Sequence, residues 1–119
     1  MAIEIEMSLP NRKLHPNGRT RNHAEMARLV RERRSLVGKY GLAHEGPPIE
    51  RGYITLKYLT FSRVRPDNDG LIAWAKSTID GLADANIIAN DRNFTVSAEW
   101  QRAPSALHSK LTVVVTSDE

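Results

Sequence analysis

The chain contains no cysteine, which excludes disulfide bonds, thiolate metal ligands and a cysteine nucleophile and fits a cytoplasmic setting. It also contains no apolar run of membrane-spanning length, and the N-terminal residues 1–6 do not resemble a signal peptide. We therefore expect a cytoplasmic protein without a membrane partner. A chain of 119 residues is long enough to bury a core, so we expect one domain over residues 1–119.

Several common catalytic and binding motifs are absent as well. No serine or threonine stands in a nucleophile-elbow pattern, and Gly18 and Gly70 stand alone instead of forming a phosphate-binding loop. The four histidines show no spacing typical of a metal site, so each is interpreted as a loop or surface residue: His15, His23, His44 and His108. The carboxylates and the basic residues are therefore the remaining candidates for a catalytic or binding role.

The charge is distributed unevenly along the chain. Residues 1–66 hold 13 Lys/Arg against 6 Asp/Glu, a net charge of +7, whereas residues 67–119 hold 4 against 8, a net charge of −4. The basic half could contact a phosphate backbone, or it could be a solvated surface. The candidate DNA contacts lie in a polar loop and in the segment after it: Arg12, Lys13, Arg19, Arg21, Arg28, Arg31 and Arg34.

Hydrophobic periodicity predicts an α+β domain with a mixed sheet of about four strands and two main helices on one face. Alternating or β-rich segments predict strands over residues 3–9, 53–64, 94–100 and 111–115. Apolar residues at helical spacing predict helices over residues 22–40 and 70–83. The turn at 104–105 between the last two strands indicates a hairpin.

The first predicted helix has one apolar face and one basic face. Its apolar positions are Met26, Leu29, Val30, Val37 and Tyr40. Five basic residues fill much of the remaining surface: Arg28, Arg31, Arg33, Arg34 and Lys39. Asn22 is expected to cap this helix, with Glu25 three residues later.

Asp67 and Asp69 end a strand-like run, and on extended backbone their side chains would point the same way. Neighbouring carboxylates repel one another unless a cation lies between them, so the pair suggests a divalent metal site. Asp91 could supply a third ligand if the sheet brings its strand close. The alternative is structural, with Asp67 and Asp91 as turn residues and Asp69 as a helix N-cap.

Lys76 and Asp80 lie one helical turn apart and could form a surface ion pair. In the functional interpretation, the Lys76 ammonium lies near the metal and stabilises phosphate charge, while Asp80 positions Lys76. Trp74 and Trp100 are interpreted as core or interface residues.

The run from Asp67 to Leu82, continued by residues 84–91, resembles the signature of the RusA family of Holliday-junction resolvases, many of which phages and prophages encode. The family pattern is Asp-x-Asp-Asn, then a helix with a Lys and an Asp four residues later, then a hydrophobic connection ending in Asp. Residues 9–12 and 15–19 also resemble the start of the phage branch. Two positions depart from the pattern: Gly70 replaces an Asn, and Asn90 replaces the first Asp of a terminal pair.

The resemblance implies a RusA-like fold and a homodimer that nicks four-way DNA junctions symmetrically. It implies that Asp67, Asp69 and Asp91 bind Mg²⁺, for which Mn²⁺ would substitute, and that Lys76 is the catalytic lysine. Two other functions stay open. One is a non-catalytic protein of the same fold that binds branched DNA. The other is a metal-dependent ribonuclease or phosphodiesterase.

Overall fold

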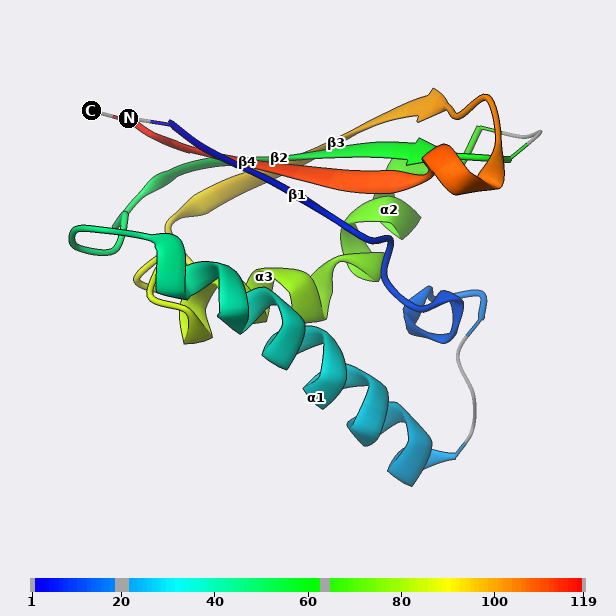
Figure 1. The fold of residues 1–119 in the computed structure, drawn as a ribbon, viewed down its shortest axis with the longest axis horizontal. Coiled ribbons are helices and arrows are strands. Elements are labelled where there is room, and N and C mark those ends of the chain that lie inside the picture. Colours follow the sequence, from blue (N-terminus) through cyan, green and yellow to red (C-terminus); the bar gives the residue numbers. More distant parts are fainter. Residues whose placement is uncertain (1, 19–21, 63–64, 119) are drawn as a thin grey trace.

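A computed structural model describes residues 2–18, 22–62 and 65–118 (Figure 1). Arg19 and Arg21 lie outside these ranges, as do the last two residues of the strand predicted over 53–64. In chain order, the helices and strands are β1 (Ala2–Met7), η1 (Arg12–Leu14), α1 (His23–Tyr40), η2 (Gly41–Ala43), β2 (Gly52–Thr60), α2 (Asn68–Trp74), α3 (Lys76–Asp84), β3 (Phe94–Arg102), η3 (Ala106–His108) and β4 (Lys110–Ser117).

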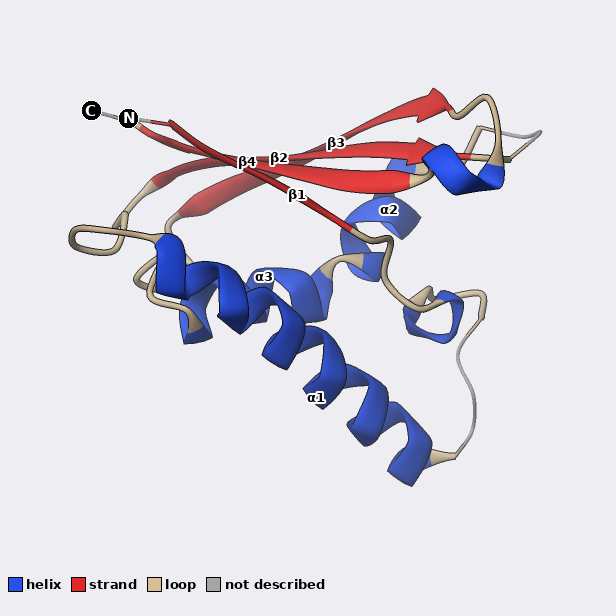
Figure 2. Ribbon diagram, in the orientation of Figure 1, coloured by secondary structure: helices blue, strands red, loops and turns tan. Residues whose placement is uncertain are grey.

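The four strands form one mixed sheet in the order β1-β4-β2-β3. β4 pairs antiparallel with both β1 and β2, whereas β2 and β3 are parallel and aligned from Gly52↔Phe94 to Thr60↔Arg102. All three α-helices cover one face of the sheet (Figure 2). On β2, Ile54, Leu56 and Tyr58 point into the core on that face. The predicted α+β class, with a four-stranded mixed sheet, is confirmed.

The predicted hairpin of the last two strands is wrong. β3 is an edge strand, and β4 lies on the other side of β2. The connection after β3 crosses the end of β2, where Ala103 N–H donates to the Thr60 carbonyl at 2.8 Å. Three consecutive residues of β4, Leu111 to Val113, are buried. Such a continuously buried run suits a strand with neighbours on both sides.

The second predicted helix, over 70–83, is two helices instead of one. α2 ends at Trp74, and Ala75 leaves helical geometry with φ −91° and ψ 5° before α3 begins at Lys76. At this point the Ala75 N–H donates to Ile72 O at 3.1 Å, a three-residue step. The Leu71 carbonyl accepts the Tyr58 hydroxyl at 2.7 Å. A side chain of the sheet therefore terminates α2.

α1 begins where the sequence predicts, because the Asn22 side chain accepts the Glu25 N–H at 3.1 Å. The placement of Arg33 on the basic face is wrong: Arg33 is only 5% exposed. Its Nε donates to Thr78 Oγ1 at 2.8 Å, so the guanidinium joins α1 to α3. Desolvation lowers the pKa of Arg33, with Tyr58 and Tyr40 opposing that shift.

The contact of α1 with α3 depends on a residue that lacks a side chain. A Cβ at Gly81 would lie 2.7 Å from the Val37 Cβ and 3.3 Å from the Arg34 Cα. Both neighbours belong to α1, so the helices approach closely only because position 81 is glycine. This contact brings α3, which carries Lys76 and Asp80, close against α1.

We predict that Gly81→Ala lowers the free energy of unfolding by about 1–3 kcal/mol, because the added methyl overpacks this helix contact. Gly38→Ala is the matched control, since a Cβ at Gly38 meets nothing within 4 Å. That substitution should be neutral or should stabilise the protein by up to about 1 kcal/mol through helix propensity. Urea denaturation of both variants measures the difference, and equal stabilities would contradict the packing argument.

Candidate functional site

The helix that follows Asp67 is held to the sheet by two aromatic residues. Trp74 of α2 stacks on Tyr58 of β2 with ring centroids 5.4 Å apart and planes 6° from parallel. The Trp74 indole N–H donates to the Asn11 carbonyl at 2.9 Å, and the Tyr58 hydroxyl donates to Leu71 O. These contacts bring the end of β2, α2 and the loop after β1 together.

Asp67 and Asp69 lie at the N-terminal end of α2 and line one hollow of about 510 Å³. The walls of this hollow come from the loop after β1, the segment after β2 and the first turn of α2. Its lining residues are His15, Pro16, Asn17, Ser62, Arg65, Pro66, Asp67, Asp69 and Gly70. The two aspartates therefore share a cavity although only Asp67 has extended backbone and Asp69 lies in the first turn of α2.

The capping alternative for this pair is wrong in its details. Asp67, not Asp69, occupies the N-cap position of α2, and its side chain makes no capping hydrogen bond. Within the described part of the chain, neither carboxylate takes part in a hydrogen bond or an ion pair. Both side chains are exposed. Two free carboxylates facing one hollow have the chemistry to accept a cation.

Lys76, the first residue of α3, lies between two acids. Its Nζ is 3.3 Å from Asp80 Oδ1, as predicted from their spacing, and 3.9 Å from Asp91 Oδ2. The Lys76 side chain is 70% exposed, so these ion pairs orient the ammonium more than they stabilise the fold. Asp80 and Asp91 are thus joined through Lys76, although they are 11 positions apart in the chain.

The structure does not gather Asp91 with Asp67 and Asp69. Among residues 2–18, 22–62 and 65–118, no three His, Asp or Glu side chains form a group that could hold a metal. Mg²⁺ often takes only one or two carboxylates and completes its shell with waters and substrate phosphate. The free Asp67 and Asp69 carboxylates fit that requirement, whereas Asp91 contacts Lys76 instead.

His15 is the residue at this site that the sequence analysis missed. It lies in a loop, as the sequence predicts, and its half-buried ring lines the hollow beside Asp67 and Asp69. The ring meets Trp74 edge to face, with centroids 5.5 Å apart. No local spacing in the sequence pairs His15 with residues more than 50 positions away, so only the fold could reveal this placement.

A second hollow of about 550 Å³ adjoins the first, since both are lined by His15, Asn17, Ser62 and Pro66. Its walls include the apolar residues Leu9, Leu71 and Trp74, and Arg12 lies on its lining. The two hollows are therefore neighbouring parts of one face of the molecule.

Some of the candidate DNA contacts already form ion pairs within the protein, and others do not. Arg34 forms a bidentate pair with Asp84 at 2.6 and 2.7 Å, which raises the pKa of Arg34 and lowers that of Asp84. Lys13 pairs with Glu25, and Arg28 pairs with Glu32 at 2.7 Å. Arg12 and Arg31 are exposed and form no ion pair within the described ranges.

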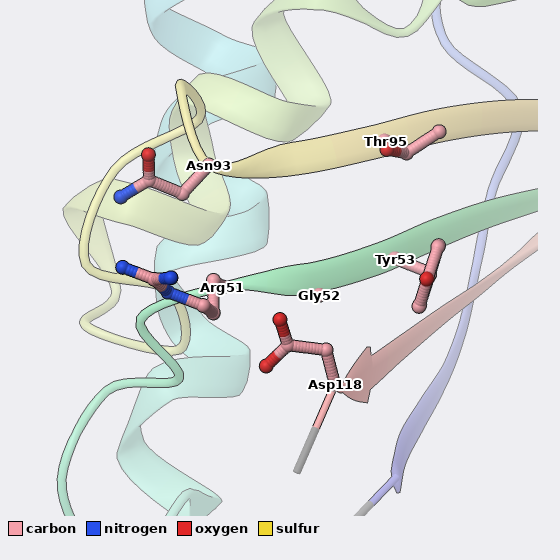
Figure 3. A pocket seen from close by; sticks show the side chains of 6 residues that line it. All are labelled: Arg51, Gly52, Tyr53, Asn93, Thr95 and Asp118. Atoms are coloured by element: carbon pink, nitrogen blue, oxygen red, sulfur yellow. The ribbon is translucent and has the colours of Figure 1, made fainter.

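A third hollow, of about 260 Å³, lies at the opposite end of β2 and contains none of the predicted site residues. Figure 3 shows it between the start of β2, the start of β3 and the end of β4, with Arg51, Asn93 and Asp118 around it. Asp118 is therefore an exposed carboxylate remote from Asp67 and Asp69, and it serves below as a control.

No protein-family model matches this chain, and no curated protein is significantly similar to it. The resemblance to the RusA family therefore rests on the sequence motif itself. None of the helices in the described part of the chain is long and apolar enough to cross a membrane.

We predict that Tyr58→Phe lowers the free energy of unfolding by about 1–3 kcal/mol at neutral pH, because Leu71 O loses its hydroxyl partner. Burial raises the pKa of Tyr58 well above its usual value near 10, so the tyrosine stays neutral in the folded protein. Its stabilising contribution is complete below about pH 10 and is lost as the pH rises further.

The stability difference between wild type and Tyr58→Phe should therefore shrink between pH 9 and pH 11, which urea denaturation at each pH measures. Tyr53→Phe is the control, because Tyr53 is 53% exposed and should leave the curve unchanged. A difference independent of pH would contradict the role assigned to the buried hydroxyl.

Proposed function

We propose that this chain is a cytoplasmic, Mg²⁺-dependent endodeoxyribonuclease that cuts four-way DNA junctions as a homodimer. The observation that supports it most is the pair of free, exposed carboxylates, Asp67 and Asp69, lining one hollow. Two carboxylates on one hollow can attract a divalent cation, and they match the Asp-x-Asp motif of the resemblance.

In this proposal Asp67 and Asp69 hold the Mg²⁺, with water and a DNA phosphate completing the shell. A bound ion would supply the positive charge that polarises a scissile phosphate and activates water. Asp91 is proposed as a third ligand on the strength of the resemblance. It would have to leave its contact with Lys76 to reach the ion.

Lys76 is proposed to stabilise the negative charge that develops on the phosphate during attack. Its exposed ammonium is available to a ligand, and Asp80 and Asp91 hold it in a limited range of positions. A neutral residue at position 76 would remove this charge and would leave Asp67 and Asp69 unchanged.

The basic residues are proposed to bind the DNA backbone, which they contact without reading its sequence. Arg12 and Arg31 can contact a phosphate without breaking an ion pair. Lys13, Arg28 and Arg34 would each have to leave a carboxylate of the protein to bind a phosphate. Arg19 and Arg21 remain proposals from the sequence. A homodimer with a two-fold axis would present two equivalent sites to a junction of matching symmetry.

A non-catalytic protein that binds branched DNA is the second candidate. One observation favours it: no three acidic or histidine side chains gather as a metal site within the described ranges. Such a protein would bind junctions with the same basic residues but would leave the phosphodiester intact.

We predict that Asp69→Asn and Lys76→Met each reduce Mg²⁺-dependent cleavage of a four-way junction by about 100-fold or more, because each removes charge at the reacting phosphate. Asp118→Asn, the remote carboxylate control, should cut like wild type. Gel analysis of labelled junctions measures the rates, and linear duplex and RNA are run beside them.

The outcomes separate the candidate functions. Cleavage that survives Asp69→Asn would disprove the metal site, and binding without cleavage by wild type would favour the DNA-binding protein. Equal cutting of RNA and linear duplex would favour a ribonuclease or general phosphodiesterase.

A further inference from the structure

We propose that His15 is a phosphate-binding residue, whose Nε2–H donates a hydrogen bond to a non-bridging phosphate oxygen of DNA held beside Asp67 and Asp69. This rests on the proposed function in taking DNA as the ligand and in placing a metal ion on the aspartates. It goes beyond that function because His15 is neither among the proposed metal ligands and catalytic lysine nor among the candidate basic contacts.

The tautomer of His15 follows from its own loop. The Asn17 backbone N–H donates to His15 Nδ1 at 3.1 Å, and a backbone amide can only donate. Nδ1 is therefore the acceptor, and the neutral imidazole holds its proton on Nε2. The ring is thus a hydrogen-bond donor at Nε2 without first gaining a charge.

The orientation of the ring places that donor against the first turn of α2. A Cβ at Gly70 would lie 3.3 Å from His15 Nε2 and 3.4 Å from Cε1, so this edge of the imidazole faces the turn that carries Asp69. The edge-to-face contact with Trp74 fixes the ring from another side, with an interplanar angle of 67°. Because Trp74 is itself anchored, His15 is held in place before any ligand arrives.

The donor at Nε2 has no acceptor within the described residues, although its ring is half-buried and its other nitrogen is bonded. An unused donor facing a hollow needs a partner from solvent or from a ligand. The charged groups around that hollow are Arg65, Asp67 and Asp69. A phosphate there would gain from Arg65 and from a metal on the aspartates, and its oxygen would accept from His15.

The test compares two substitutions, each of which preserves the hydrogen-bonding role of one ring nitrogen. Asparagine can place a side-chain acceptor near the position of Nδ1 but has no donor at Nε2, whereas glutamine can extend an amide N–H toward the position of Nε2. We expect His15→Asn to weaken junction binding in Ca²⁺, and cleavage in Mg²⁺, by about 10- to 100-fold, the loss of one hydrogen bond to a charged group. His15→Gln should recover most of that loss.

A spectroscopic measurement on the wild type tests the contact directly. Long-range ¹H–¹⁵N NMR of the histidine side chains, with a synthetic four-way junction and Ca²⁺, should shift the His15 Nε2 signal as DNA binds. Gly70→Ala places a methyl against Nε2 and should reduce that shift. Gly38→Ala, which adds a methyl in open space, should preserve it.

Each result bears on one proposal or the other. An Nε2 signal unmoved by DNA, or equal losses in His15→Asn and His15→Gln with unchanged melting temperatures, would overturn the role of His15. Either result would leave the proposed nuclease activity standing, provided that wild type cuts junctions and Asp69→Asn does not. If DNA shifts the Nε2 signal but no cleavage occurs, the phosphate contact stands and the nuclease fails.

Discussion

The stack of Trp74 on Tyr58 is the contact on which the arrangement of the site depends. It places a helix directly on the central strands, and the polar tips of the two rings bind the backbone at Asn11 and Leu71. A buried aromatic pair contributes both apolar area and a preferred geometry, and here it also satisfies polar groups from two other segments. Asp67 and Asp69 lie at the start of the helix that this stack anchors, and the ring of His15 packs against Trp74.

The parallel pairing of β2 with β3 explains why the three aspartates do not meet. Asp67 lies seven positions after the last residue of β2, whereas Asp91 lies three positions before the first residue of β3. In parallel strands these are opposite ends, and the crossover formed by α2 and α3 runs between them. Lys76 begins the second helix of the crossover, so Asp91 reaches its ammonium instead of the other two carboxylates.

Local patterns predicted the elements well, because alternation and helical spacing report burial on one face. The Asn22 cap and the Lys76–Asp80 pair were predictable for the same reason, since each lies within one helical turn. The break at Ala75 was not, because no glycine or proline marks it and its cause is the hydroxyl of Tyr58, 13 positions before Leu71. The strand order, the burial of Arg33 and the placement of His15 likewise depend on long-range contacts that no short window contains.

The two acidic groups, Asp67 with Asp69 and Asp80 with Asp91, differ in the positive charge that lies beside them. Lys76 lies between Asp80 and Asp91, so one ammonium already offsets part of their negative charge. Asp67 and Asp69 have no such partner within the described ranges, and Arg65 is the only cationic residue among those that line their hollow. A divalent ion therefore gains more by entering that hollow than by displacing Lys76. Asp67 and Asp69 are therefore the stronger candidates to bind a cation, and the ammonium of Lys76 stays available to contact a phosphate.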